Sequence, residues 1–109
     1  MKIVWTRPAI DDVESIRTFI EPDDPRAAAR VVLRITSAVE SLEGAPSIGR
    51  PGRIANTREW VLVTIPYIVA YRVVAGVLEV LRVLHTSRRW PRRLNHRRAP
   101  SAVHSARAR

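Results

Sequence analysis

Aliphatic residues recur in the first 42 positions at the spacing of two amphipathic helices. Successive members lie three or four residues apart in both segments. They are Ile10, Val13, Ile16 and Ile20 in the first segment, and Ala28, Val31, Ile35, Val39 and Leu42 in the second. Such spacing gathers each set on one helix face. We therefore expect a helical hairpin, with the two apolar faces packed together.

Turn and capping residues bound these two helices. Pro8 suits the first turn of a helix capped by Thr6 or Arg7, and Asp24-Pro25 repeats the pattern before the second helix. Three acidic residues are expected to complement the positive end of the first helix, namely Asp11, Asp12 and Glu14. Residues 2–5 are rich in strand formers, so a short strand is predicted before the hairpin.

The spacing of the apolar residues changes from helical to strand-like near residue 58. Residues 60–65, 67–74 and 77–85 are rich in β-branched and aromatic side chains, and Pro66 and Gly76 separate them at hairpin-like intervals. Three antiparallel strands are predicted. Residues 44–57 hold three of the four glycines and are expected to form an irregular loop. Its Arg50 and Arg53 give only a weak anion-binding signal, because the features of a P-loop are missing.

Alternation along the strands predicts which side chains share a sheet face. Tyr67, Val69, Tyr71 and Val73 are expected on one face, with Ile68, Ala70, Arg72 and Val74 on the other. Glu79 and Arg82 are separated by an odd number of residues, so they are expected on opposite faces. The whole pattern predicts an α+β fold in the order β-α-α-β-β-β, with a helical hairpin packed on a small, mainly antiparallel twisted sheet.

Charge is distributed unevenly along the 109 residues. The net charge is +9, but residues 1–86 contribute only +1, and residues 87–109 contribute +8 through eight arginines and no acidic residue. We expect one domain over residues 1–91 and a basic, flexible tail over residues 92–109. A solvated tail is the favoured interpretation. A nucleic-acid-binding module that uses the tail is a further hypothesis, and such contact would be non-specific and sensitive to salt.

The sequence argues against several kinds of functional site and against secretion or insertion into a membrane. The absence of cysteine excludes disulfides, thiol catalysis and cysteine-ligated zinc, and neither a metal nor a cofactor is expected. The longest apolar run, residues 60–71, is broken by Thr64 and Pro66 and is far shorter than the roughly 20 residues of a membrane span. The N-terminus lacks the apolar stretch of a signal peptide. We expect a cytoplasmic protein that does not insert into membranes.

A series of motifs in the second half resembles the RelE/ParE toxin superfamily. They are Gly49-Arg50-Pro51-Gly52-Arg53, Thr57-Arg58-Glu59, Ile65-Pro66-Tyr67-Ile68-Val69-Ala70-Tyr71-Arg72-Val73, Leu81-Arg82-Val83-Leu84-His85 and Arg88-Arg89-Trp90-Pro91. The resemblance spans residues 1–91, and its specific part is 49–91. It implies the toxin of a type II toxin-antitoxin module, which arrests bacterial growth until a cognate antitoxin covers it.

The superfamily has two branches, and the resemblance implies different chemistry for each. One branch cleaves messenger RNA on the ribosome, and the ParE branch inhibits DNA gyrase by binding. If this chain were a ribonuclease, its catalytic candidates would be Glu59, Arg72, Arg82, His85 and Arg88. Structural roles are favoured for these residues: His85 as a hydrogen-bonding residue at a strand end, and Arg72 or Arg82 as ion-pair partners of Glu59 or Glu79.

Departures from the ribonuclease pattern favour the ParE branch. RelE-like ribonucleases carry a basic residue after the aromatic that opens the middle strand, whereas Tyr67 is followed by Ile68. Their lysines on the preceding strand are also missing, since residues 60–63 are apolar. The favoured hypothesis is therefore a non-enzymatic gyrase inhibitor, and the alternative is a ribosome-dependent mRNA endoribonuclease.

Either branch implies an antitoxin that wraps the helix pair and the sheet edge. Arginines at intervals of four form a stripe on the second helix, for which a solvated face is the favoured interpretation and an acidic docking strip the functional one. Tryptophans are candidate anchors, although Trp60 in the core is an equally good interpretation. The candidate antitoxin-binding residues are Arg26, Arg30, Arg34, Arg58, Trp60, Arg72 and Trp90.

Overall fold

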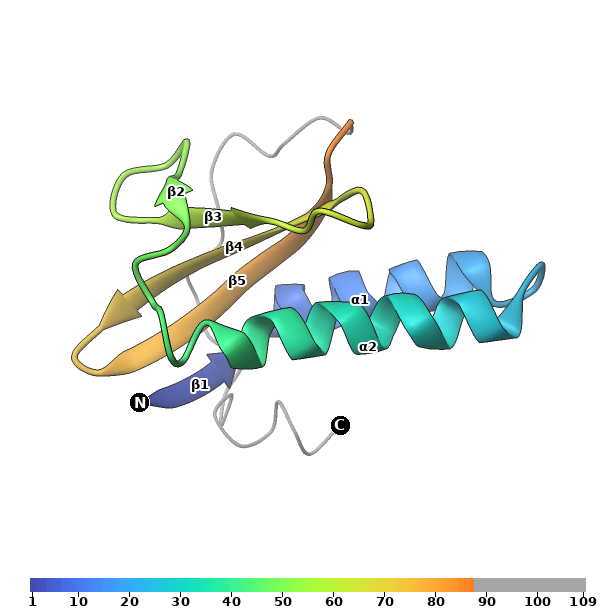
Figure 1. Ribbon diagram of the computed structural model, residues 1–109, viewed down its shortest axis with the longest axis horizontal. Coiled ribbons are helices and arrows are strands. Elements are labelled where there is room, and N and C mark those ends of the chain that lie inside the picture. Colours follow the sequence, from blue (N-terminus) through green and yellow to red (C-terminus); the bar gives the residue numbers. More distant parts are fainter. Residues whose placement is uncertain (88–109) are drawn as a thin grey trace.

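The computed structural model of the chain describes residues 1–87, which form one sheet and a helical hairpin (Figure 1). The elements in chain order are β1 (Lys2–Trp5), α1 (Arg7–Ile20), α2 (Pro25–Ser41), β2 (Arg50–Pro51), β3 (Arg58–Val61), β4 (Tyr67–Val74) and β5 (Val77–His85). The proposed tail at 92–109, together with Arg88 and Trp90, lies outside the described residues. The boundary at residue 91 therefore stays a prediction.

The sheet has the strand order β1-β5-β4-β3-β2. Neighbouring strands are antiparallel except for β1, which pairs in parallel with the first half of β5. The predicted α+β class, with a hairpin on a mainly antiparallel sheet, is confirmed. One strand was not predicted: β2, inside the loop assigned to residues 44–57, pairs with the start of β3.

Strand bounds differ from the prediction at one place. The strand expected over residues 60–65 begins two residues earlier, at Arg58, and ends at Val61. The early start follows from its two neighbours, because Arg58 and Glu59 pair with β2 on one side and with β4 on the other. Residues 67–74 and 77–85 are strands as predicted.

Both helices begin at the predicted caps. The Thr6 hydroxyl accepts a hydrogen bond from the Ala9 N–H, and the Asp24 carboxylate accepts one from the Ala27 N–H. Each cap satisfies a helix N–H that has no partner within the helix. The acidic residues expected at the positive end of α1 are absent from its first turn, so that part of the prediction was wrong.

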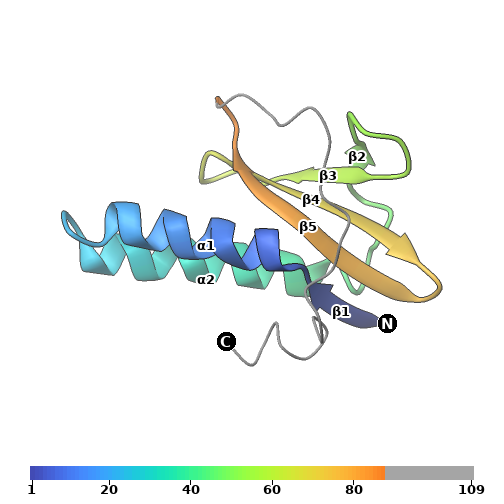
Figure 2. The same ribbon diagram turned by 180° about the vertical axis from the view of Figure 1, so that it is seen from behind.

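The core lies between the hairpin and one face of the sheet. Both helices and the central strands contribute fully buried residues to it. They include Ala9 of α1, Ile35 and Val39 of α2, Tyr71 of β4 and Leu78 of β5. The hairpin extends past the sheet, so the turn between the helices lies far from the strands in both views (Figures 1 and 2). Burial on the sheet side therefore anchors only part of each helix.

A β-bulge in β5 overturns the predicted facing of Glu79 and Arg82. Tyr71 pairs with Val80 but the preceding residue, Ala70, pairs with Arg82, so Leu81 is an extra residue in β5. Cross-strand partners share a sheet face, and Arg72 of β4 pairs with Glu79. Ala70 and Arg72 lie on one face by alternation, which places Glu79 and Arg82 on that same face.

Candidate functional site

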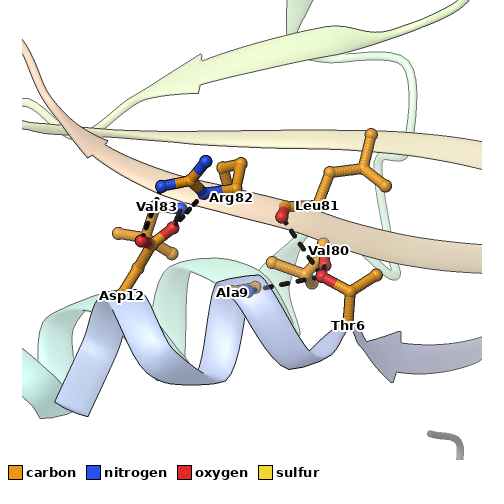
Figure 3. A network of polar contacts seen from close by, with 7 residues as sticks. All are labelled: Thr6, Ala9, Asp12, Val80, Leu81, Arg82 and Val83. Carbon is orange, nitrogen blue, oxygen red and sulfur yellow. Dashed lines mark hydrogen bonds and ion pairs between the residues drawn. The ribbon is translucent and has the colours of Figure 1, made fainter. Parts of the chain in front are cut away.

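The junction between α1 and β5 is held by two polar side chains of α1 and its cap (Figure 3). The buried Thr6 hydroxyl donates to the carbonyls of Val80 and Leu81, at 2.9 and 3.1 Å. The Asp12 carboxylate accepts two hydrogen bonds from the Arg82 guanidinium, at 2.7 and 2.9 Å, and one from the Val83 N–H, at 2.8 Å. Asp12 thus binds the edge of β5 beyond the residues that β1 covers.

The contact with Asp12 keeps the Arg82 guanidinium charged and holds it against α1. The hydrogen bonds that Arg82 donates to Asp12 raise the pKa of the Arg82 guanidinium above its ordinary value, although burial opposes the rise. Arg82 was a candidate for charge stabilisation in a ribonuclease site, but its guanidinium forms an ion pair with Asp12 of α1. The carboxylate of Asp12 was not identified as a partner from the sequence, because the two residues are 70 positions apart.

The face of the sheet away from the helices carries the other charged candidates. Glu59 is almost fully buried and forms ion pairs with Arg50, at 3.0 Å, and Arg53, at 3.6 Å. It also accepts a hydrogen bond from the Arg53 N–H. Arg72 pairs with the buried Glu79 at 2.5 Å, as the structural interpretation expected. These contacts bind the two carboxylates to arginines and leave Glu59 poorly suited to act as a base.

His85 lies apart from these charges. Its partner across the ladder is Tyr67, which shares the helix-side face with Val69 and Tyr71, whereas Arg72 is on the opposite face. The two rings meet edge to face, with centroids 5.3 Å apart, and the Ser87 N–H donates to Nδ1 of His85. Tyr67 and Arg72 are five positions apart on β4, about 17 Å along the strand. His85 is therefore separated from Arg72 and lies on the sheet face opposite Glu59 and Arg72.

Tyr71 fixes the loop that leads from α2 to β2. Its buried hydroxyl donates to the Pro46 carbonyl at 2.7 Å and accepts from the Gly49 N–H at 3.0 Å. Burial raises the pKa of Tyr71 above its ordinary value of 10.0, and the Gly49 N–H and the positive charge of Arg58 oppose that rise. The phenol is consequently a neutral structural group at physiological pH.

Arg58 lies at the rim of a cavity of about 500 Å³ that also borders Arg72. Its Nη1 donates to the carbonyls of Ser47, at 3.2 Å, and Gly49, at 2.7 Å. Arg58 is thereby held by backbone oxygens of the loop. Arg58 and Arg72 are both predicted antitoxin-binding residues, and both line this one cavity.

The hairpin presents the basic stripe and two large apolar side chains to solvent. Arg26, Arg30 and Arg34 are all exposed, and Arg34 donates to the Thr64 hydroxyl. Leu33 lies three residues after Arg30 on α2 and is 65% exposed, and Phe19 near the end of α1 is 75% exposed. Neither apolar side chain was singled out from the sequence, because amphipathic spacing identifies buried positions and not exposed ones.

A second exposed apolar patch lies where β3 ends. Val61 is 36% exposed and Val63 is 94% exposed, in the segment where the resemblance implies lysines for RelE-like ribonucleases. Trp60, between the sheet and the hairpin, instead packs against the core, which was one of its two interpretations. The outward-facing surface of this segment is therefore apolar.

Within residues 1–87, no three acidic or histidine side chains are placed to hold a metal ion together. In the same part of the chain, neither helix has the length and apolar character needed to cross a bilayer.

The chain is similar to known bacterial toxins over most of its length. A family model described as "ParE toxin of type II toxin-antitoxin system, parDE" matches residues 3–90. "Putative toxin Y4kP" of Sinorhizobium fredii is 51% identical over 90 residues, covering 83% of this chain and 93% of the relative. "Toxin RelE2" of Caulobacter vibrioides is 38% identical over 87 residues, covering 80% of this chain and 97% of that protein.

A solved structure agrees with these sequence matches. It is titled "Chromosomal ParDE TA system from P. aeruginosa", has a TM-score of 0.75 and 26% identity, and the match covers 80% of this chain and 97% of that one. The resemblance inferred from the motifs is thereby confirmed. This chain belongs to the ParE toxin family, within the RelE/ParE superfamily, and is a toxin of a type II toxin-antitoxin system.

Proposed function

We propose that this toxin arrests growth by binding DNA gyrase, and that it does not cleave RNA. The observation that carries the proposal is that three of the four described ribonuclease candidates are held in ion pairs, and the fourth, His85, lies apart from them. Glu59 and Arg82 are engaged in ion pairs, Arg72 pairs with Glu79, and His85 lies on the opposite sheet face. A general base, a general acid and cations must surround one phosphate to cleave RNA.

The surface at the end of β3 also supports a protein target. RNA binding requires cations, whereas Val61 and Val63 offer apolar side chains. Exposed apolar patches mark protein interaction sites. The likeness to the structure titled as a ParDE system points in the same direction. Resemblance to the ParE branch implies inhibition of gyrase.

The ribonuclease alternative draws support from one residue and one relative. His85 is only half-buried, and histidine is the side chain that most often acts as a general acid or base. The relative named RelE2 shares 38% identity with this chain. The alternative differs from the favoured proposal in its expected product, which would be cleaved messenger RNA.

Purified toxin should inhibit supercoiling by gyrase, or trap gyrase on cleaved DNA, while messenger RNA on translating ribosomes stays intact. His85→Ala should leave this inhibition within a factor of two or so of the unsubstituted toxin, since removal of a general acid or base would cost roughly 100-fold or more. Cleavage of ribosome-bound messenger with no effect on gyrase would overturn the proposal in favour of the alternative.

We further propose that the cognate antitoxin covers the projecting part of the hairpin. The exposed Phe19 and Leu33 offer apolar anchors, and Arg26 and Arg30 offer cations that form no ion pair with any residue up to 87. An amphipathic helix with acidic residues beside its apolar face would complement this mixture. The surface is available because the hairpin extends past the sheet (Figure 2).

Leu33→Glu should weaken binding of the antitoxin about 30-fold or more, because it places a charge at an apolar anchor. Isothermal titration with the purified antitoxin measures the loss. Ile48→Glu is the matched control, since Ile48 is an aliphatic residue that is 52% exposed but lies in the loop after α2. Equal losses in the two variants, or no loss in Leu33→Glu, would remove the hairpin from the antitoxin interface.

A further inference from the structure

The turn between β3 and β4 reaches the helical hairpin through a polar contact. Arg34 of α2 donates a hydrogen bond from Nη1 to the Thr64 hydroxyl, and both residues are exposed. The turn lies beside the hairpin in Figure 1. Thr64 follows Val63, which is 94% exposed, so an enzyme that approaches this turn has direct access to the hydroxyl.

The Thr64 hydroxyl differs from the exposed hydroxyls of the helices. Thr18 and Ser41 donate to backbone carbonyls of their own helices. The Thr64 oxygen instead accepts a hydrogen bond from a cation. Thr64 also lies in a turn, where the backbone adapts to an enzyme's active site more easily than a helix does. Access and a neighbouring positive charge therefore coincide at this hydroxyl.

Arg34 has the capacity to hold an anion at this position. It forms no ion pair with any residue up to 87, and a guanidinium has five N–H donors, of which Thr64 uses one. Arg30 lies one helical turn earlier on the same side of α2 and is also exposed. Neither residues 25–39 nor residues 60–78 include an acidic residue. An anion on Thr64 would thus meet positive charge and no repulsion from either segment.

We propose that Thr64 is a phosphorylation site and that Arg34 binds the phosphate. The donor is ATP, and a serine/threonine kinase catalyses the transfer. The Thr64 oxygen bonds to the γ-phosphorus as the bond from that phosphorus to the bridging oxygen breaks. ADP leaves, and the hydroxyl proton passes to a base of the kinase. The product carries about −1.5 to −2 charges at pH 7.

A phosphate suits this position better than an acyl group. Guanidinium and phosphate form short, charge-assisted and often bidentate hydrogen bonds. An acyl ester would bring no charge to Arg34 and would remove the hydroxyl as a donor. The phosphate would also place negative charge next to Val63, in the apolar patch that supports a protein target. Only this last consequence, control of the patch, rests on the proposed function.

Contact between the phosphate and Arg34 is measured by ³¹P NMR on full-length toxin that carries the phosphate on Thr64. The guanidinium favours the dianion, so Arg34→Gln should raise the midpoint of the phosphate titration by about 0.5 pH unit. Arg26→Gln is the matched control, because it removes an exposed arginine two turns away on α2 and should leave the midpoint in place. Unchanged dispersion of the proton spectra shows that each variant is folded. Equal midpoints for the toxin and Arg34→Gln would overturn the phosphate contact.

The transfer itself is tested with ATP and a whole-cell extract of the bacterium that encodes the toxin. After digestion with trypsin, mass spectrometry should find one phosphate on peptide 59–72, in which Thr64 is the only serine or threonine. Peptide 18–26 is the internal control, since its Thr18 is exposed but lies in α1 between Glu14 and Glu21. No phosphate on Thr64, or as much on Thr18, would overturn the proposal. Neither measurement uses gyrase, ribosomes or antitoxin, so the proposed function and this inference fail separately.

Discussion

Gly49→Ala should lower the free energy of unfolding by about 2–3 kcal/mol. An added Cβ would lie 2.7 Å from the Tyr71 hydroxyl, 2.9 Å from its ring and 3.0 Å from the Glu59 carbonyl. Tyr71 is fully buried, so its ring has no free space into which to move. Any shift would also lengthen the hydrogen bonds from Gly49 and to Pro46, which leaves buried polar groups without good partners.

Gly44→Ala is the matched control for this substitution. Its Cβ would meet nothing closer than the Ser41 carbonyl at 3.8 Å, and neither glycine has a positive φ, so an alanine adopts both backbones without strain. The control should change stability by less than about 0.5 kcal/mol. Urea denaturation followed by tryptophan fluorescence measures both. Equal effects at the two positions would mean that Gly49 is not held against Tyr71 as described.

Asp12→Ala should cost about 2–3 kcal/mol of unfolding free energy, because three hydrogen bonds from Arg82 and Val83 end on its carboxylate. The figure is below the range for a fully buried pair, because the side chains of Arg82 and Asp12 are 24% and 15% exposed. The substitution leaves a half-buried guanidinium without its counter-ion and exposes an N–H at the edge of β5.

Asp11→Ala provides the comparison, since Asp11 is the adjacent acidic residue of α1 and its side chain is exposed. It should be nearly neutral, within about 0.5 kcal/mol. A double-mutant cycle with Arg82→Ala would isolate the coupling between Asp12 and Arg82 from the bond to Val83. A coupling energy near zero, or an equal cost for Asp11→Ala, would show that the ion pair does not anchor α1 to β5.

Local patterns predicted the elements of this fold well. Thr6 and Asp24 cap the helices, and strand β4 has the predicted bounds, because caps, turns and side-chain alternation are encoded by neighbouring residues. The parallel pairing of β1 with β5 and the two-residue strand β2 depend on contacts between distant segments. The bulge at Leu81 has no local signal, and it reversed the predicted facing of Glu79 and Arg82.

The sequence predicted which residues are candidates for the site, but not how most of them are arranged in space. The pairing of Arg72 with Glu79 was among the expected alternatives, since both residues lie in strands joined by a tight turn. The ion pairs of Glu59 with Arg50 and Arg53 form only because the loop at residues 44–57 folds back beside β3. The cavity at Arg58 likewise exists only once the loop, β3 and β4 are assembled, so no spacing in the sequence could indicate it.

The position of β5 bears on how the toxin is made. This strand is the last of the described elements in the chain, yet it lies inside the sheet, between the first strand and β4. Until the ribosome has completed and released it, the growing chain has neither a partner for β1 nor the strand on which α1 packs. A message cut short before codon 77 would therefore yield a fragment that lacks β5, and we expect the toxin to fold, and to act, only after that strand has left the ribosome.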